Sequence, residues 1–225
     1  MAKKILFALT SHGTLGDTGR KTGYYVPEVA HPAAVFRRAG YEVEYVSVQG
    51  GAAPRDGVNP DDTVVADFLA DPATAEALRA TPTAAEIDAG AYDAIYYAGG
   101  HGTMWDFPEA TGLADVARAI YERGGVVAAV CHGPAALVNL RLSDGSHLVD
   151  GKQVSSFTDE EEDAVGLTGV VPFLLESKLT ERGAKFTRAP KFAAHAVADS
   201  RLVTGQNPAS AARVAELVVE QLGAR

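Results

Sequence analysis

The chain has 225 residues, of which 47% are hydrophobic and 22% are charged, a composition typical of a soluble globular protein. This length suffices for one well-filled domain, and we predict a single domain over residues 1–225. The formal net charge of −9 argues against nucleic acid or an anionic membrane as the main partner, because both would repel the protein.

The chain contains one cysteine, so it forms no internal disulfide and carries no sign of an oxidising compartment. The apolar run Ile5 to Leu9 near the N-terminus is too short for a signal peptide or a membrane span. We therefore expect a cytoplasmic protein that does not use a membrane.

Predicted strands and helices alternate in the first half of the chain. The apolar run 5–9 is typical of a buried strand. The segment 10–25 that follows is far longer than an ordinary connection from a strand to a helix, and this length indicates a functional loop. A helix is predicted over 26–40, with Glu28 near its start, where the helix dipole favours an acid. The next predicted elements are strands over 42–48 and 94–98 and a helix over 112–123.

Residues 50–90 interrupt this alternation. They are rich in Pro, Asp, Ala and Thr, and only 64–69 and 74–79 are predicted as short helices. We interpret the segment as an inserted cap or an oligomer-contact excursion.

The second half begins with a valine-rich strand over 126–130 that passes through a Cys-His-Gly-Pro turn into a helix. The alternation predicts an α/β fold, a mostly parallel sheet with helices on both faces. In such sheets the reacting groups gather outside the carboxyl ends of the strands. The later predicted elements are strands over 153–157, 185–188, 194–198 and 202–204, an acidic helix start over 158–163, and helices over 172–183 and 208–222.

Cys131 lies on the turn after the valine-rich strand. A lone cysteine at the end of an apolar strand is more often an inert core residue, but His132 and Gly133 suit a sharp strand-to-helix turn that resembles a nucleophile elbow. A helix N-terminus would stabilise a thiolate, the reactive form. We predict that Cys131 is a nucleophile and His132 its base, with backbone N–H groups near Gly99, Gly100 and His132 lining an oxyanion site. Spacing alone does not choose the carboxylate that orients the histidine.

Several ring-bearing side chains surround these positions in the sequence. By neighbourhood, His101, Trp105 and Phe107 are predicted to shape the pocket wall, and Tyr24 or Tyr25 to reach its mouth. The chain has no zinc-type ligand motif, so we predict no bound metal.

Five motifs follow one another along almost the whole chain. They are Ala98-Gly99-Gly100-His101-Gly102-Thr103, Asp106-Phe107-Pro108, Val130-Cys131-His132-Gly133-Pro134, Phe157-Thr158-Asp159 with Glu162, and Val203-Thr204-Gly205-Gln206-Asn207-Pro208-Ala209-Ser210. In this order they resemble the ThiJ/PfpI superfamily. The branch they most resemble is the single-domain, heat-shock-chaperone-like glyoxalase III and protein deglycase group.

The resemblance implies a flavodoxin-like three-layer sandwich, related to the class I glutamine amidotransferase fold, that assembles as a homodimer. It implies a triad of Cys131, His132 and Glu162, with the neighbouring Asp163 as the alternative acid. Glu28 matches the family's acid that hydrogen-bonds the cysteine sulfur. Burial and a neighbouring anion should both raise the pKa of that carboxyl, so we expect Glu28 to keep its proton.

The activity implied is glutathione-independent conversion of methylglyoxal or a related 2-oxoaldehyde to a 2-hydroxy acid, through a hemithioacetal on Cys131 and without a metal or organic cofactor. Removal of glycation adducts from proteins or nucleotides, cysteine peptidase or amidase activity, and a holdase chaperone or redox sensor are the alternatives. Glutaminase activity is disfavoured, because the late histidine of this chain, His195, lacks the acid two residues further on.

Overall fold

The computed structural model describes residues 2–223, and within them six strands form the central sheet in the order β3-β1-β5-β6-β10-β9. Neighbouring strands are parallel except β9, which runs antiparallel to β10. The five parallel strands have the flavodoxin-like order, so the predicted α/β class is confirmed. The strands are β1 (Lys4–Leu9), β3 (Glu42–Ser47), β5 (Ala94–Tyr97), β6 (Val126–Val130), β9 (Ala196–Asp199) and β10 (Leu202–Gly205).

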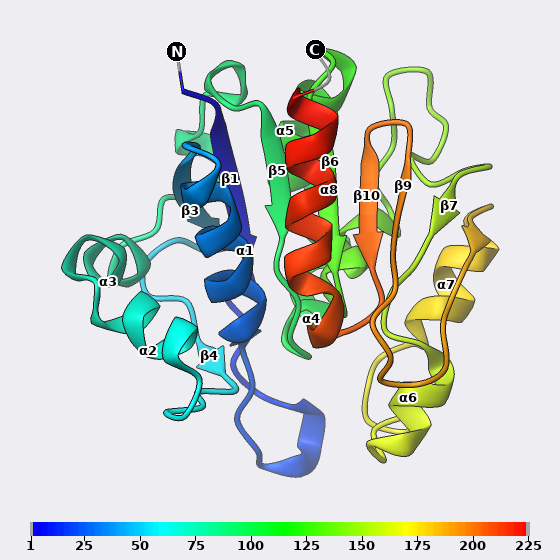
Figure 1. Ribbon diagram of the computed structural model, residues 1–225. Helices are drawn as coiled ribbons and strands as arrows, with labels where there is room; N and C mark the ends of the chain where they lie inside the picture. The colour runs from blue at the N-terminus through cyan, green and yellow to red at the C-terminus, as the bar shows by residue number, and fades with distance from the viewer. Residues whose placement is uncertain (1, 224–225) are drawn as a thin grey trace.

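Helices cover both faces of this sheet (Figure 1). α1 (Pro27–Arg38) and α8 (Ala211–Gly223) pack together on one face, and α5 (Thr111–Glu122) packs on the other. Successive side chains of β1 point to opposite faces, so Phe7 joins the layer of α1 and α8 while Leu6 joins that of α5. Both side chains are fully buried, which explains why this strand is a continuous apolar run.

Residues 50–90 lie beside the β3 edge of the sheet (Figure 1). α2 (Thr63–Ala70) and α3 (Pro72–Arg79) form close to where they were predicted, because Asp62 and Asp71 cap their N-terminal N–H groups. β4 (Arg55–Asp56) pairs with β2 (Tyr24–Tyr25), so this segment also reaches the long loop after β1.

Several elements differ from the predictions. The turn after Cys131 continues as a short 3₁₀ helix, Gly133–Leu137, in place of an α-helix. The strand predicted over 153–157 shortens to β7 (Gln153–Val154), because the N–H of Ser155 donates to Thr204 Oγ1 (2.8 Å) and that of Phe157 to the Cys131 carbonyl (2.8 Å). β7 pairs with β8 (Lys185–Phe186) outside the central sheet, and α7 (Leu175–Glu181) begins after bends at 171–173. The remaining helices are α4 (Thr103–Asp106) and α6 (Asp159–Ala164).

No helix within residues 2–223 combines the length and the apolar character that a membrane crossing requires.

Candidate active site

Cys131 directly follows β6 and has the left-handed backbone of a nucleophile elbow, with φ of 57°. Two backbone hydrogen bonds hold this sparsely populated conformation: the Cys131 N–H donates to Gly205 (2.9 Å), and its carbonyl accepts from Phe157 (2.8 Å). Gly133 is needed at the turn, because a Cβ there would lie 2.3 Å from the carbonyl oxygen of Tyr97. The predicted elbow is therefore present in the fold.

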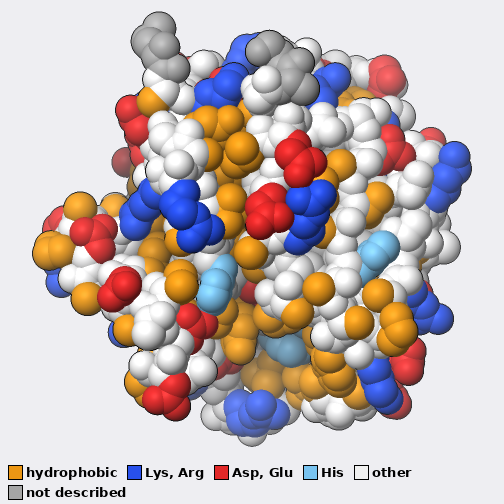
Figure 2. Space-filling view, viewed as in Figure 1, with side chains coloured by type: hydrophobic (Ala, Val, Ile, Leu, Met, Phe, Trp, Pro, Cys, Tyr) orange, Lys and Arg blue, Asp and Glu red, His pale blue; other side chains and the backbone are white. Residues whose placement is uncertain are grey.

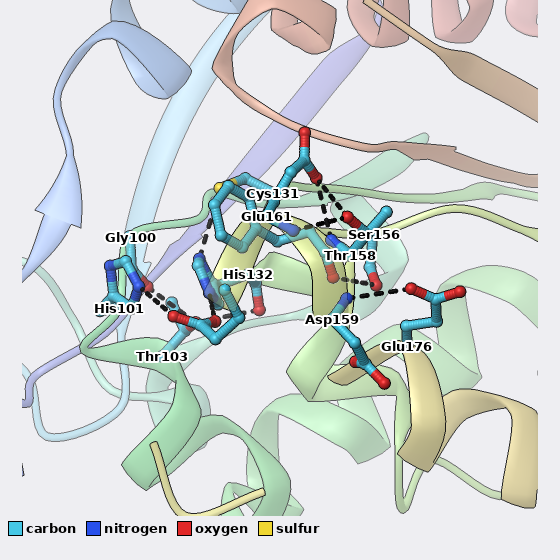
Figure 3. Close-up of polar contacts among 12 residues, drawn as sticks. Gly100, His101, Thr103, Cys131, His132, Ser156, Thr158, Asp159, Glu161 and Glu176 are labelled. Carbon is cyan, nitrogen blue, oxygen red and sulfur yellow. Dashed lines mark hydrogen bonds and ion pairs between the residues drawn. The ribbon is translucent and has the colours of Figure 1, made fainter. Parts of the chain in front are cut away.

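A chain of polar contacts leads from the sulfur to a buried carboxylate (Figure 3). Cys131 Sγ lies 3.4 Å from His132 Nδ1, and His132 Nε2 lies 2.7 Å from Glu162 Oε2. An ionised carboxylate only accepts hydrogen bonds, so this pairing places the imidazole proton on Nε2 and leaves the Nδ1 lone pair facing the sulfur. The neighbouring acid Asp163 is exposed. Of the two candidate acids, Glu162 is the one that contacts the histidine.

His101 contacts the second oxygen of the same carboxylate. Its Nε2 lies 2.9 Å from Glu162 Oε1, and its ring is 4.0 Å from that of His132, measured between centroids. Burial opposes ionisation of Glu162, but the hydrogen bonds from both histidines outweigh it and lower its pKa to about 2. Burial and the adjacent His101 lower the pKa of His132 to about 4. The imidazole of His132 is therefore neutral at pH 7.

Glu28 lies in the first turn of α1 and is completely buried, with neither carboxyl oxygen reaching a well-formed hydrogen bond among the described residues. Burial raises its pKa to about 8, and the nearby Cys131 thiol and Gly99 N–H offset only part of the rise. Gly99 makes room for this carboxyl, because a Cβ there would lie 2.3 Å from Glu28 Oε2. Glu28 is thus largely protonated at pH 7, as the sequence led us to expect.

The surroundings of the Cys131 sulfur oppose the thiolate that the sequence led us to expect. Burial raises the pKa of the Cys131 thiol, and the N–H of His132 beside the sulfur opposes this rise only in part. The 3₁₀ helix that follows is too short to supply the helix N-terminus that was expected to stabilise a thiolate. Burial therefore favours the thiol form, whose proton must leave during the reaction.

The glycine turn after β5 packs against the loop that carries the tyrosines. Gly100 has φ of 108°, and a Cβ there would lie 2.3 Å from the carbonyl oxygen of Gly23. The Gly99 carbonyl accepts the N–H of Tyr25 (2.9 Å). Among the described residues, no protein acceptor meets the N–H of Gly100, and Gly100 lines the pocket over the sulfur.

A pocket of about 260 Å³ opens over the sulfur. Two residues predicted for the pocket wall lie elsewhere. The ring of Trp105, on α4, stacks on that of His12 with 5.1 Å between centroids, and Phe107 packs on Tyr97 in the core. The pocket is lined by six residues that the sequence predicted for the site: Tyr25, Glu28, Gly100, His101, Cys131 and His132. Its wall also contains five residues that the sequence did not single out for it: Asp56, Phe157, Val165, Phe192 and Pro208.

Glu161 is a further residue that the sequence did not single out. It is fully buried, and its Oε1 accepts hydrogen bonds from Phe192 N–H (2.7 Å), Gln206 Nε2 (3.0 Å) and Asn207 Nδ2 (2.9 Å). Its Oε2 accepts from the N–H of Thr158 (2.9 Å), which caps α6. Through these hydrogen bonds the Glu161 carboxylate connects the start of α6, which carries Glu162, to the segment before β9 and to the segment after β10.

His101, His132 and Glu162 have donor atoms within 4.8 Å of one another, a spacing that a cation could bridge. In the structure these atoms hydrogen-bond each other instead, with one histidine on each oxygen of the carboxylate. A cation would have to displace both N–H protons, so the set fits a hydrogen-bonded network better than a metal centre.

His195, the late histidine considered for an amidotransferase triad, lies 3.0 Å from Thr187 Oγ1 through its Nε2 and does not line the pocket. The histidine beside Cys131 is His132, from the same turn. The site thus pairs a cysteine with the histidine next to it in the sequence.

The fold and the site together define a class: α/β sandwich proteins with a cysteine elbow at the carboxyl end of a parallel sheet. The family model described as "DJ-1/PfpI family" matches residues 22–221, and the chain belongs to this family. The chain is 37% identical to "Glyoxalase 3" of Candida albicans, over 96% of this chain and 97% of the relative. It is also 37% identical to "Glutathione-independent glyoxalase HSP31" of Saccharomyces cerevisiae, over 98% of each.

Among solved structures, the chain is similar to Rapid Encystment Protein 24 KDa of Francisella tularensis. The TM-score is 0.94 at 37% identity, and the match covers 98% of this chain and 99% of that one. The similarity extends over the whole sandwich, including the elements that carry the site.

Proposed function

We propose that this protein is a glutathione-independent glyoxalase that converts methylglyoxal or a related 2-oxoaldehyde to the 2-hydroxy acid. The observation that carries the proposal is that Cys131, His132 and Glu28 line one small pocket, with Glu162 bonded to His132 and with no well-formed hydrogen bond to Glu28 from residues 2–223. The two glyoxalase relatives, similar over nearly their full length, support the same activity.

The reaction starts when the Cys131 sulfur adds to the aldehyde carbon. The thiol proton passes to His132 Nδ1, whose charge Glu162 stabilises, and the carbonyl electron pair moves to the oxygen, which takes the proton of Glu28. In this proposal the N–H of Gly100 stabilises negative charge on that oxygen. The product of this step is a hemithioacetal with Glu28 ionised.

Glu28 then moves a proton between the two carbons. Its carboxylate takes the hydrogen of the sulfur-bearing carbon, and the freed electron pair shifts toward the neighbouring ketone, whose oxygen takes the proton from His132. Glu28 returns its proton to that second carbon while the first hydroxyl gives its own to His132, which leaves a thioester on Cys131. Water then adds its hydroxyl to the thioester carbon and gives its proton to Glu28, and the departing sulfur takes the proton of His132, which releases the 2-hydroxy acid and restores the thiol. The sum is addition of one water, with no oxidant or metal.

The proposal is tested by incubating the purified protein with methylglyoxal in the absence of glutathione and measuring lactate by chiral chromatography. We expect one lactate for each methylglyoxal consumed. Loss of methylglyoxal without lactate would indicate simple adduct formation, and no loss from a folded protein would contradict the proposal.

The roles of the two neighbouring acids are separated by a matched pair of variants. Glu162→Gln presents an amide N–H group beside the histidines and cannot hold both imidazole protons, so we expect kcat to fall about 10²-fold or more. Asp163→Asn changes an exposed acid one residue further along α6 and should leave kcat within about twofold, as for most surface substitutions. Equal effects of the two substitutions would contradict the role of Glu162.

Metal independence is a separate prediction. Because His101, His132 and Glu162 satisfy one another's hydrogen bonds, we expect dialysis against a strong chelator to leave kcat unchanged within about twofold. A loss of activity that added Zn²⁺ restores would show that the three side chains hold a metal.

A homodimer, a single domain with an inserted segment over 50–90, and a cytoplasmic location stay predictions. Sedimentation equilibrium of the purified protein checks the first of them.

A further inference from the structure

The wall of the pocket away from the sulfur is apolar and partly exposed. Phe192 is 51% exposed and Val165 is 42% exposed, and both line the pocket together with Phe157 and Pro208. Hydrophobic side chains gather on the lower part of the face shown in Figure 2, at the end of the molecule where β10 finishes. An exposed apolar rim of this kind is typical of a binding site.

The backbone of Phe192 is fixed in an unfavourable conformation. Its φ of 63° lies in the left-handed region, which a bulky residue rarely adopts and which costs free energy unless the surroundings impose it. Here the surroundings do so, because the Phe192 N–H donates to the buried Glu161 (2.7 Å), which Gln206 and Asn207 hold in turn. The backbone that carries this ring is therefore held at the pocket by a buried hydrogen-bond network.

The same network holds the carboxylate partner of His132. Glu161 and Glu162 are adjacent in the first turn of α6, so one segment fixes both the aromatic side chain at the rim and the acid in the floor of the site. The distance from the rim to the sulfur is thus set by the fold.

The charge of the pocket adds a second constraint. The residues that line it include no lysine or arginine, and Asp56 is an exposed acid among them. An anionic substituent would lose its hydration there without gaining a cationic partner.

We propose that Phe192 is a specificity residue that packs against the substituent of the substrate, so that the pocket prefers 2-oxoaldehydes with an uncharged apolar substituent. This inference rests on the proposed glyoxalase function. The aldehyde carbon lies at Cys131, and the substituent extends along Phe157 and Val165 to the ring of Phe192.

The test compares glyoxal, which has no substituent, with phenylglyoxal and 4-carboxyphenylglyoxal. We expect Phe192→Ala to lower kcat/KM for phenylglyoxal about tenfold, because this substrate reaches the ring. The value of kcat/KM for glyoxal, which does not reach the ring, should change by less than about twofold. Val58→Ala serves as the matched control, since Val58 is also 51% exposed but does not line the pocket. It should change neither value, and Phe192→Leu should restore most of the phenylglyoxal activity.

The carboxylated substrate tests the charge preference at nearly constant size. In the unaltered protein its kcat/KM should be at least about tenfold below that of phenylglyoxal, because the carboxylate is desolvated without a partner. A parallel loss on all substrates in Phe192→Ala, or equal rates for the two aryl substrates in the unaltered protein, would overturn the inference. Absence of turnover with every substrate would instead refute the glyoxalase function itself.

Discussion

Replacing Cys131 by alanine is expected to lower kcat at least about 10³-fold while the protein stays folded, because the sulfur forms the covalent bond to the substrate and no neighbouring group can substitute for it. The side chain is only 4% exposed, but alanine fills most of its volume and keeps both backbone hydrogen bonds of the elbow. The measurement is lactate formation at saturating methylglyoxal, together with thermal unfolding followed by circular dichroism.

Cys131→Ser is the informative companion to this variant. A hydroxyl is a far weaker nucleophile than a thiol in the same neutral site, so serine should be nearly as inactive as alanine. If either variant kept more than about a tenth of the original kcat, the sulfur would not be the group that attacks the aldehyde.

Replacing Glu28 by glutamine is expected to lower kcat about 10² to 10⁴-fold, because an amide cannot carry a proton from one carbon to the next. The substitution keeps the size of the side chain, and the protonated carboxyl it replaces is neutral as well. KM should therefore change much less than kcat. A glutamine variant with unchanged kcat would assign the proton transfer to His132.

Glu28→Gln should also change how the free energy of unfolding depends on pH. The folded-state pKa of Glu28 is about 8, above the ordinary value of 4.5, so its contribution to stability is fully present below pH 4.5 and is lost as the pH rises toward 8. The free energy of unfolding of the unaltered protein should thus fall, relative to that of Glu28→Gln, between these two pH values. Urea denaturation of both proteins at pH 5 and pH 8 measures it, and a constant difference would contradict the raised pKa.

The fold could be predicted from the sequence because its signals are local. The apolar runs that became β1 and β6, and the turn at Cys131, depend on residues within a few positions of one another. Glu162 is different, because choosing it over Asp163 requires knowing which face of α6 meets His132.

The remaining parts of the pocket depend on contacts between distant segments. Asp56 arrives through the pairing of β4 with β2, and Phe192 through its hydrogen bond to Glu161. Sequence proximity to His101 suggested Trp105 for the wall, but one turn of α4 directs that ring to His12. Burial of the Cys131 sulfur, which raises the pKa of its thiol, is likewise a tertiary effect that the position of the residue after β6 does not reveal.

The elbow sulfur is the only cysteine in the 225 residues, and this gives the protein a built-in chemical label. Every alkylating or oxidising adduct on a thiol, seen as a mass increment on the intact chain, must sit at this one position. Active sites can therefore be counted by mass spectrometry, and a preparation whose turnover is low can be divided into molecules that are chemically blocked and molecules that are intact but slow.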